Sequence, residues 1–83
     1  MKYHVIQKPH KFMKPYLAVH GELPKNELPV RMRHMHRHSI YIDKDICKEN
    51  TARERRILLH EYREMRFMEH GMKYKKAHRK AGY

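Results

Sequence analysis

The sequence predicts an α+β fold, in which a small antiparallel sheet of about three strands precedes a long helix and a short return helix. Short apolar runs interrupted by proline and glycine fill the first half of the chain, whereas residues 51–70 contain neither residue and show helical periodicity. Gly71 separates this segment from a second, shorter helical stretch. With 83 residues, the chain is expected to form a single domain, 1–83, with strands and loops in 1–43 and a two-helix region in 51–81.

The N-terminal half is predicted to contain the strands. Residues 3–7 are the first candidate, and residues 16–20, which end at Gly21, are the second. The proline-containing segment 23–29 is expected to be a loop. Side chains alternate over residues 30–43, which predicts a longer strand. One face of that strand would carry Val30, Met32, His34, His36, His38, Ile40 and Ile42.

Three histidines, His34, His36 and His38, would form a row on one face of this strand. Neighbours in such a row lie within about 7 Å of each other, so the row could bind a metal ion. No carboxylate or fourth ligand lies nearby in the sequence. A row that faces solvent or a nucleic acid is therefore the favoured interpretation.

Residues 51–70 form the long predicted helix of about five turns. Thr51 and Glu54 match a capping box, and Gly71 provides a C-terminal stop. A helical projection separates an apolar arc from a basic face. The arc contains Ile57, Leu58, Met65, Phe67 and Met68. The basic face carries Arg55, Arg56, Arg63, Arg66 and His70, with Leu59 as its apolar exception.

Three ionisable residues of this helix, His60, Glu61 and Glu64, fall inside the apolar arc. Positions i and i+4 share a helix face, so His60 and Glu64 can contact one metal ion, with Glu61 about 100° further round. The spacing matches a His-Glu-x-x-His zinc helix in which a glutamate replaces the second histidine, and two histidines with one glutamate form a known catalytic zinc site. Because the glutamate after the first histidine is the general base in that motif, Glu61 is the candidate catalytic residue.

The predicted return helix, residues 73–80, could place His78 beside His60 and Glu64. These three residues are the predicted ligands of Zn²⁺ or another divalent metal, which would also stabilise the thin core of so short a chain. Carboxylates that face a core are costly unless they are protonated, paired or bound to a cation. Two alternatives stay open: an ion-pair network from Arg53 to Glu64, and a purely structural role for His78 in the core.

The segment 39–81 resembles a known group of proteins. It contains Ile40-Tyr41-Ile42-Asp43, then Leu58-Leu59-His60-Glu61-x-x-Glu64, and then Gly71-Met72-x-Tyr74-x-x-Ala77-His78-x-x-Ala81. These motifs resemble small uncharacterised phage and archaeal proteins that are similar to a minimal zincin-type metallopeptidase core. The resemblance implies a metal-dependent hydrolase, with His60, Glu64 and His78 as metal ligands, Glu61 as the base and residues 40–43 lining the cleft. The sequence departs from the zincin motif at Glu64, where a second histidine is usual.

The net charge of +11 is concentrated outside the long helix. Residues 43–69 hold seven acidic and seven basic side chains, whereas residues 1–42 hold eight Lys or Arg against two Glu, and residues 72–83 hold five basic residues and no acid. This distribution is typical of proteins that bind phosphate backbones or acidic partners, although basic surface can also serve solubility alone. The candidate nucleic-acid contacts are Arg31, Arg33, Arg37, Lys73, Lys75, Lys76, Arg79 and Lys80. The competing hypothesis is thus a non-enzymatic basic module in which the His/Glu cluster is structural.

The single cysteine, Cys47, cannot form an intrachain disulfide and is expected to be unreactive. No apolar run approaches the length of a membrane span, and no apolar segment follows the basic N-terminus as in a signal peptide. A cytoplasmic location without a membrane partner is therefore expected.

Overall fold

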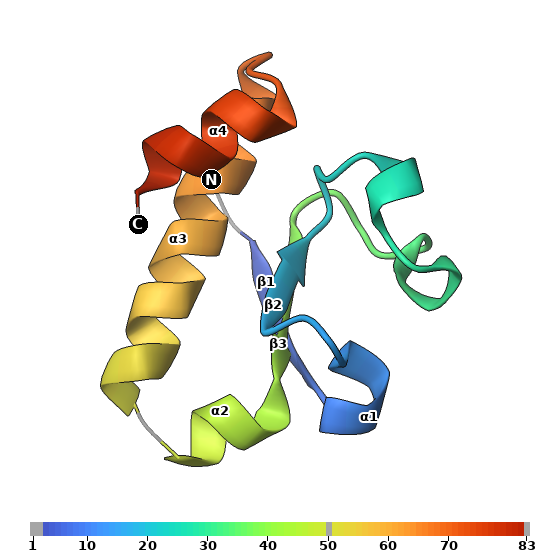
Figure 1. Cartoon of the computed structure of the whole chain (residues 1–83), viewed down its shortest axis with the longest axis vertical. Helices are drawn as coiled ribbons and strands as arrows, with labels where there is room; N and C mark the ends of the chain where they lie inside the picture. The colour runs from blue at the N-terminus through green and yellow to red at the C-terminus, as the bar shows by residue number, and fades with distance from the viewer. Residues whose placement is uncertain (1–2, 50, 83) are drawn as a thin grey trace.

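The structure is a computed structural model that describes residues 3–49 and 51–82, without the side chains of residues 49 and 51. It confirms the predicted α+β class, with a long helix and a short C-terminal helix (Figure 1). The elements, in chain order, are β1 (His4–Lys8), α1 (His10–Met13), β2 (Ala18–His20), the 3-10 turns η1 (Lys25–Glu27) and η2 (Val30–Met32), β3 (Ser39–Asp43), α2 (Lys44–Glu49), α3 (Thr51–Glu69) and α4 (Tyr74–Ala81).

The sheet has the strand order β1-β3-β2, so β3 is central. It is mixed, and not antiparallel throughout as expected: β1 runs parallel to β3, and β2 runs antiparallel to it. Parallel pairing requires a long connection, which residues 9–38 provide between β1 and β3. A central strand is covered on both faces, and four of the five residues of β3 are buried accordingly.

The predicted strand over residues 30–43 is wrong for residues 30–38. Pro29 precedes the 3-10 turn η2, and the chain then continues in turns to β3. Met32 and Met35 are 0% and 5% exposed, so burial follows a spacing of three and not the alternation of a strand. The predicted row of His34, His36 and His38 therefore does not exist on a strand face, and all three are exposed in turns.

The core has two parts, one on each side of the sheet. Under the loops between β1 and β3 lies a cluster formed by Met13, Val19, Leu28, Met32 and Met35. On the other side, α3 crosses β2 and β3, and α4 lies against the C-terminal part of α3 (Figure 1). The fully buried Met65 of the predicted apolar arc lies on α3, whereas Leu59 on its basic face is 47% exposed.

The turn between α3 and α4 determines how the two helices pair. The amide of Gly71 donates to the carbonyl of Met68, and the amide of Met72 donates to that of Phe67, which is the Schellman pattern of helix termination. Gly71 has a φ of +96°, a conformation that glycine adopts at little cost. The predicted stop at Gly71 is thus confirmed. The predicted cap residue at the other end, Thr51, has a side chain outside the described residues.

Candidate metal centre

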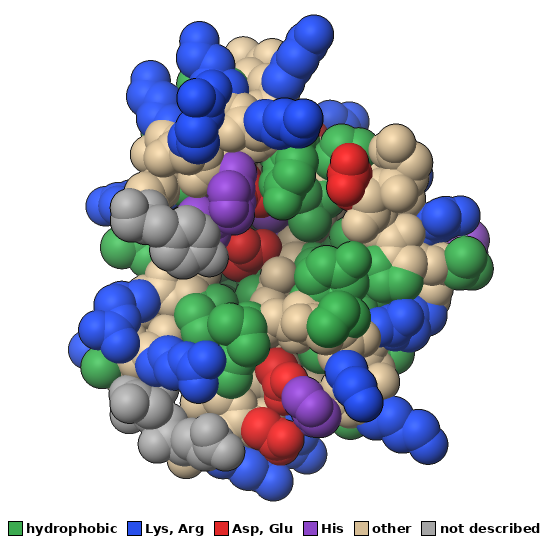
Figure 2. Space-filling model, viewed as in Figure 1, with side chains coloured by type: hydrophobic (Ala, Val, Ile, Leu, Met, Phe, Trp, Pro, Cys, Tyr) green, Lys and Arg blue, Asp and Glu red, His purple; other side chains and the backbone are tan. Residues whose placement is uncertain are grey.

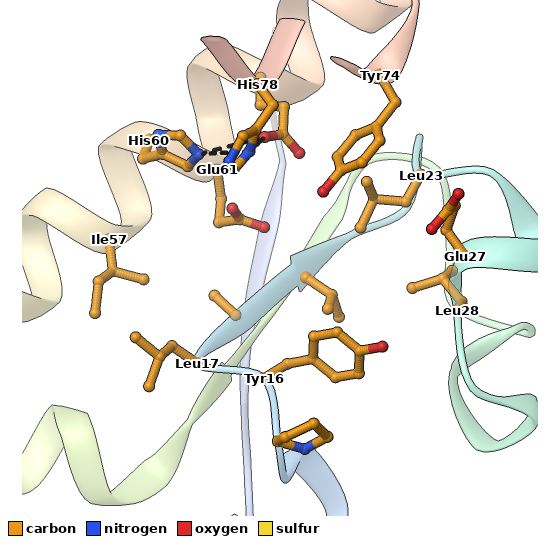
Figure 3. Close-up of a pocket in the computed structure, with 14 residues that line it drawn as sticks. Tyr16, Leu17, Leu23, Glu27, Leu28, Ile57, His60, Glu61, Tyr74 and His78 are labelled. Atoms are coloured by element: carbon orange, nitrogen blue, oxygen red, sulfur yellow. Dashed lines mark hydrogen bonds and ion pairs between the residues drawn. The ribbon is translucent and has the colours of Figure 1, made fainter. Parts of the chain in front are cut away.

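Three side chains from two helices converge at one point. His60 and Glu64 lie one turn apart on α3, and His78 reaches them from α4. The Nε2 atom of His60 lies 3.3 Å from Oε2 of Glu64 and 3.4 Å from Nδ1 of His78. The Nδ1 atom of His78 lies 2.6 Å from the same Glu64 oxygen. Figure 3 shows His60 and His78 side by side above the pocket, and their rings are nearly perpendicular, with an interplanar angle of 82°.

These separations can be compared with the shape of a tetrahedral metal site. Ligand atoms at zinc distances occupy tetrahedron corners that are roughly 3.3 to 3.5 Å apart. Two of the three separations, 3.3 Å and 3.4 Å, agree with this value. The third, 2.6 Å, is a hydrogen-bond length that would have to widen by about 0.7 Å to reach this spacing. Since the side chain of His78 is 41% exposed, it has room to move, and the three residues fit a metal ion.

The close approach of α4 to α3 explains why His78 reaches the site. Ala77 and Ala81 are 0% and 2% exposed, and their small side chains allow the two helices to lie close together. The chain end then places the carbonyl oxygen of Gly82 3.4 Å from Nδ1 of His60. With a proton on Nδ1, His60 donates to this carbonyl and keeps the Nε2 lone pair available for a metal, as is usual for histidine ligands.

A fourth residue, His20, completes the surroundings of Glu64. His20 is fully buried at the end of β2, and its Nε2 lies 2.7 Å from Oε1 of Glu64. The backbone amide of Glu22 donates to Nδ1 of His20 over 3.2 Å. Because Nδ1 accepts this hydrogen bond, the proton of a neutral His20 is on Nε2 and points at Glu64. His20 therefore holds the carboxylate from one side while Oε2 faces His60 and His78.

Sequence analysis missed His20. The sequence predicts His20 only as the last residue of a strand. The one local signal for a further role is that a histidine ends this apolar run before Gly21. Gly21 itself is required there, because a Cβ at this position would lie 1.9 Å from the carbonyl oxygen of His36. The atoms of His20, Glu61 and Glu64 also lie close enough to hold a metal ion. Since Nε2 of His20 carries its proton toward Glu64, His20 is better suited to orient this carboxylate than to bind a metal.

The two carboxyl groups of the motif have opposite pKa shifts. Glu61 is 8% exposed, and burial, together with the nearby charge of Glu64, raises its pKa well above the usual value. Burial alone would also raise the pKa of Glu64, but hydrogen bonds from His20 and His78 outweigh it and lower the pKa. The lowered pKa favours the charged form of Glu64, the candidate ligand, whereas the raised pKa favours the protonated form of Glu61.

The alternative ion-pair network from Arg53 to Glu64 is not what surrounds the carboxylate. Arg53 lies about 16 Å from Glu64 along the helix axis, which is beyond the reach of the two side chains. The partners of Glu64 are instead His20, His60 and His78.

A pocket of about 300 Å³ opens beside the three residues (Figure 3). The carboxyl group of Glu61 and the hydroxyl group of Tyr74 both point into it (Figure 3). Its opposite wall is formed by residues 15–19, which include part of β2, and by the loop residues Leu23, Glu27 and Leu28. Figure 2 shows carboxylate and imidazole side chains together in a hollow on this face of the molecule. A substrate in the pocket could reach both Glu61 and the candidate metal position.

The predicted basic contacts of the N-terminal half take part in internal bonds. Arg31 donates to the backbone carbonyls of Phe12 and Lys14, and Arg33 donates to that of Leu28. Arg37 forms two hydrogen bonds with the carboxylate of Glu22. These three arginines therefore hold the loops together.

The basic residues of the C-terminal segment lie on a different surface. Lys73, Lys75, Lys76 and Arg79 line a cavity of about 570 Å³ together with Phe67, His70, Gly71 and Met72. The ammonium group of Lys80 lies 5.3 Å from the centre of the Phe67 ring. This group of cations lies on and around α4, where Figure 2 shows several Lys and Arg side chains projecting from the molecule.

A second group of possible ligands and the single cysteine lie elsewhere in the fold. His10, Asp43 and Asp45 bring possible ligand atoms together, but Asp43 binds Nδ1 of His10 over 2.6 Å and caps the backbone amide of Asp45 over 2.9 Å, which stabilises the start of α2. Burial, with a contribution from Glu54, raises the pKa of Cys47 to about 11, so its thiol stays protonated near neutral pH and is poorly reactive.

Comparison with known proteins gives no match. No family model matches the sequence. No curated protein and no solved structure matches the chain. Among the described residues, no helix is long and apolar enough to cross a membrane.

Proposed function

We propose that the protein is a zinc-dependent hydrolase with a minimal metallopeptidase-like site, as the resemblance to a zincin core implies. The observation that carries the proposal is the convergence of His60 Nε2, Glu64 Oε2 and His78 Nδ1, with separations from 2.6 to 3.4 Å. Two imidazoles and one carboxylate suit zinc better than the hard cations Mg²⁺ and Ca²⁺, which prefer oxygen ligands. Three protein ligands leave a fourth position for water or substrate, as in catalytic zinc sites.

Glu61 has the position and environment of a general base. A bound divalent ion would lower the pKa of a coordinated water towards neutrality and polarise a substrate carbonyl. The positive charge of the ion would also lower the pKa of Glu61 and so counteract the increase that burial causes. The carboxylate of Glu61 would then accept the proton of the attacking water and later donate it to the leaving group. Glu64 cannot take this role, because its two oxygens are occupied by His20 and His78.

The edge of the sheet favours an extended peptide as substrate. The strand β2 is an outer strand, and Ala18 and Val19 line the pocket. The amide of Asp43 donates to the carbonyl of Leu17, and the amide of Gly21 donates to the carbonyl of Ser39. The backbone N–H and C=O groups of the odd-numbered residues around β2 therefore point towards β3. By alternation, the backbone N–H and C=O of Ala18 point away from the sheet and could pair with a substrate strand. Apolar side chains of Tyr16, Leu17 and Leu23 line the pocket next to this edge (Figure 3).

The direct test compares metal content and proteolysis in the untagged protein and in Glu61→Gln. We expect about one equivalent of zinc in both proteins, cleavage of an unfolded protein substrate by the wild type, and no cleavage by the variant. Glu61→Gln keeps the shape of the side chain and leaves the three ligands in place. A protein that holds no metal, and whose melting is unaffected by a chelator, would show that the cluster is only a hydrogen-bonded network.

A second candidate function, the binding of nucleic acid or another polyanion, is favoured by one observation. The cavity around α4 has four Lys or Arg side chains in its lining and no carboxylate among the described residues that line it. Such a surface attracts phosphate groups whether or not the protein is an enzyme. The salt dependence of binding tests this function, as set out below.

A further inference from the structure

A second groove, of about 520 Å³, lies next to the metal pocket along α3. The two cavities share Leu17, Ile57 and His60 in their linings, so they are adjacent parts of one surface. The groove is lined by Leu17, Arg53, Arg56, Ile57, Leu59, His60, Arg63, Ala81 and Gly82. A substrate bound at the metal pocket would therefore extend into this groove on one side.

The groove is strongly cationic. Arg56 and Arg63 are exposed and lie four residues before and three residues after His60, so they flank it where the basic face borders the apolar arc. The rise between them is about 10 Å, which leaves space for a side chain between the two guanidinium groups. No Asp or Glu occurs among the described residues that line the groove. Its charge therefore favours a carboxylate over a neutral or cationic group.

The lining of the groove also contains apolar side chains. Leu17 and Leu59 are 46% and 47% exposed, and Ile57 lies with them in the lining. The guanidinium groups of the lining can pair with a carboxylate, and the aliphatic side chains of the same lining can contact the methylene groups of an acidic side chain. The combination of arginines with aliphatic side chains distinguishes this groove from the cavity around α4, where lysines predominate.

The geometry points to an acidic-residue subsite: the groove binds an Asp or Glu side chain of a peptide substrate, one or two residues from the bond that is cleaved. Each arginine lies about one helical turn from His60, a rise of about 5.4 Å, and an extended peptide advances about 3.3 Å per residue. The acidic residue is therefore expected one or two residues from the cleaved bond. The inference rests on the proposed peptidase function, and it adds the class of substrate. It also explains why a chain with net charge +11 places three arginines around one face of the candidate site.

The test uses amidated, quenched fluorescent peptides that differ only in Glu, Gln or Lys one or two residues from the cleaved bond. For the wild type we expect kcat/KM to be roughly tenfold higher with Glu than with Gln, mainly through KM, because each exposed ion pair contributes modestly. The double variant Arg56→Gln/Arg63→Gln should lose the preference. The matched control Arg55→Gln/Lys44→Gln, which removes the same charge at exposed positions outside the groove, should keep it.

A binding measurement separates this inference from the proposed function. Fluorescence anisotropy of the same peptides with Glu61→Gln protein should show tighter binding of the Glu peptide, and this difference should disappear when Arg56→Gln/Arg63→Gln is added. If no peptide is ever cleaved but this pattern is seen, the peptidase function fails and the acidic-residue subsite stands. Equal binding of the Glu and Gln peptides, or a preference that survives loss of both arginines, overturns the subsite even if peptides are cleaved.

Discussion

Nε2 of His20 donates a 2.7 Å hydrogen bond to Oε1 of Glu64, although 44 residues separate them in the chain. The bond joins the end of β2 to the middle of α3, and both side chains are buried. It therefore connects the sheet, whose edge forms one wall of the pocket, to the helix that carries the candidate ligands. The position of β2 relative to the candidate metal centre depends directly on this pair.

Replacing His20 with alanine should affect both stability and metal binding. The change leaves Oε1 of Glu64 without its buried donor, which should lower the free energy of unfolding by about 2 to 4 kcal/mol. Loss of a residue that orients a ligand should also weaken metal affinity by roughly tenfold to a hundredfold. Chemical denaturation of the metal-free protein and competitive zinc titration measure the two effects separately.

The conservative variant His20→Gln serves as the control, because its amide can still donate to Glu64. It should recover part of the metal affinity lost in His20→Ala. If His20→Ala lowers stability while the zinc affinity of the remaining folded protein is unchanged, His20 has only a packing role.

Replacing His34, His36 and His38 together with glutamine should leave the metal content unchanged. The three histidines are exposed in turns outside the site, and His38 contacts Glu69, with Nδ1 3.2 Å from Oε1. Elemental analysis of the triple variant purified without a tag provides the measurement. Loss of the metal would place the principal metal site at His34, His36 and His38. It would contradict its assignment to His60, Glu64 and His78.

The cations around α4 should dominate any binding to polyanions. Changing Lys73, Lys75, Lys76 and Arg79 to glutamine should weaken binding to heparin or duplex DNA and reduce the slope of the log-log salt plot by up to about four. The same charge is removed, at exposed positions outside this cavity, by changing Lys11, Lys44, Lys48 and Arg55, and that variant should bind almost as the wild type does. Absence of DNA retardation even at low salt would exclude nucleic acid as the partner.

Local sequence patterns predicted the parts of the site that depend on one helix or one turn. The spacing of His60 and Glu64 fixes their common face, and Gly71 fixes the reversal that brings His78 back to them. These relationships involve neighbours within about one turn or a single glycine conformation, so they can be inferred without knowledge of the rest of the chain.

Long-range relationships were not accessible in the same way. The alternation over residues 30–38 has the period of a strand. In the structure, however, the segment forms a 3-10 helix after Pro29 and then further turns, and this conformation buries Met32 and Met35 in the core cluster beneath the loops. The parallel pairing of β1 with β3 depends on how residues 9–38 cross over, which no local pattern specifies. His20 could not be linked to Glu64, because their contact depends on how β2 packs on α3.

The stability of the metal-free protein should depend on pH through Glu61. Its folded-state pKa is raised, so the folded state favours the protonated acid. This contribution is fully present below the ordinary pKa of about 4.5 and is lost as pH rises through the raised folded value. The pKa of Glu64 is lowered, so its effect on the free energy of unfolding has the opposite pH dependence. This contribution is present above the ordinary pKa and is lost as pH falls through the lowered folded value.

The difference in melting temperature between wild type and Glu61→Gln isolates the Glu61 contribution. After removal of metal by a chelator, Glu61→Gln should gain stability relative to the wild type as pH rises from about 5 to about 8, because it has no buried carboxyl to ionise. A difference that stays constant over this range would mean that Glu61 is charged and fully compensated in the folded protein.

The candidate ligands should behave as one set. Removing any of His60, Glu64 or His78 should lower metal affinity, and zinc should no longer raise the melting temperature, since stabilisation follows the ratio of free metal to its dissociation constant. His78→Ala is the most informative single change. Its side chain is 41% exposed, against 6% for His60 and 3% for Glu64, so its removal should disturb the metal-free fold least.

A comparison of His78→Ala with Glu61→Gln then separates metal binding from catalysis. We expect His78→Ala to melt close to the metal-free wild type and to bind zinc weakly, whereas Glu61→Gln should bind zinc as the wild type does and cleave nothing. Equal zinc affinity in His78→Ala and the wild type would remove His78 from the site and shift the assignment to another group with ligand atoms close together, such as His20, Glu61 and Glu64. Zinc held by every protein with intact ligands, but without cleavage of any peptide, would assign the metal a structural role and make the cationic surface around α4 the better guide to function.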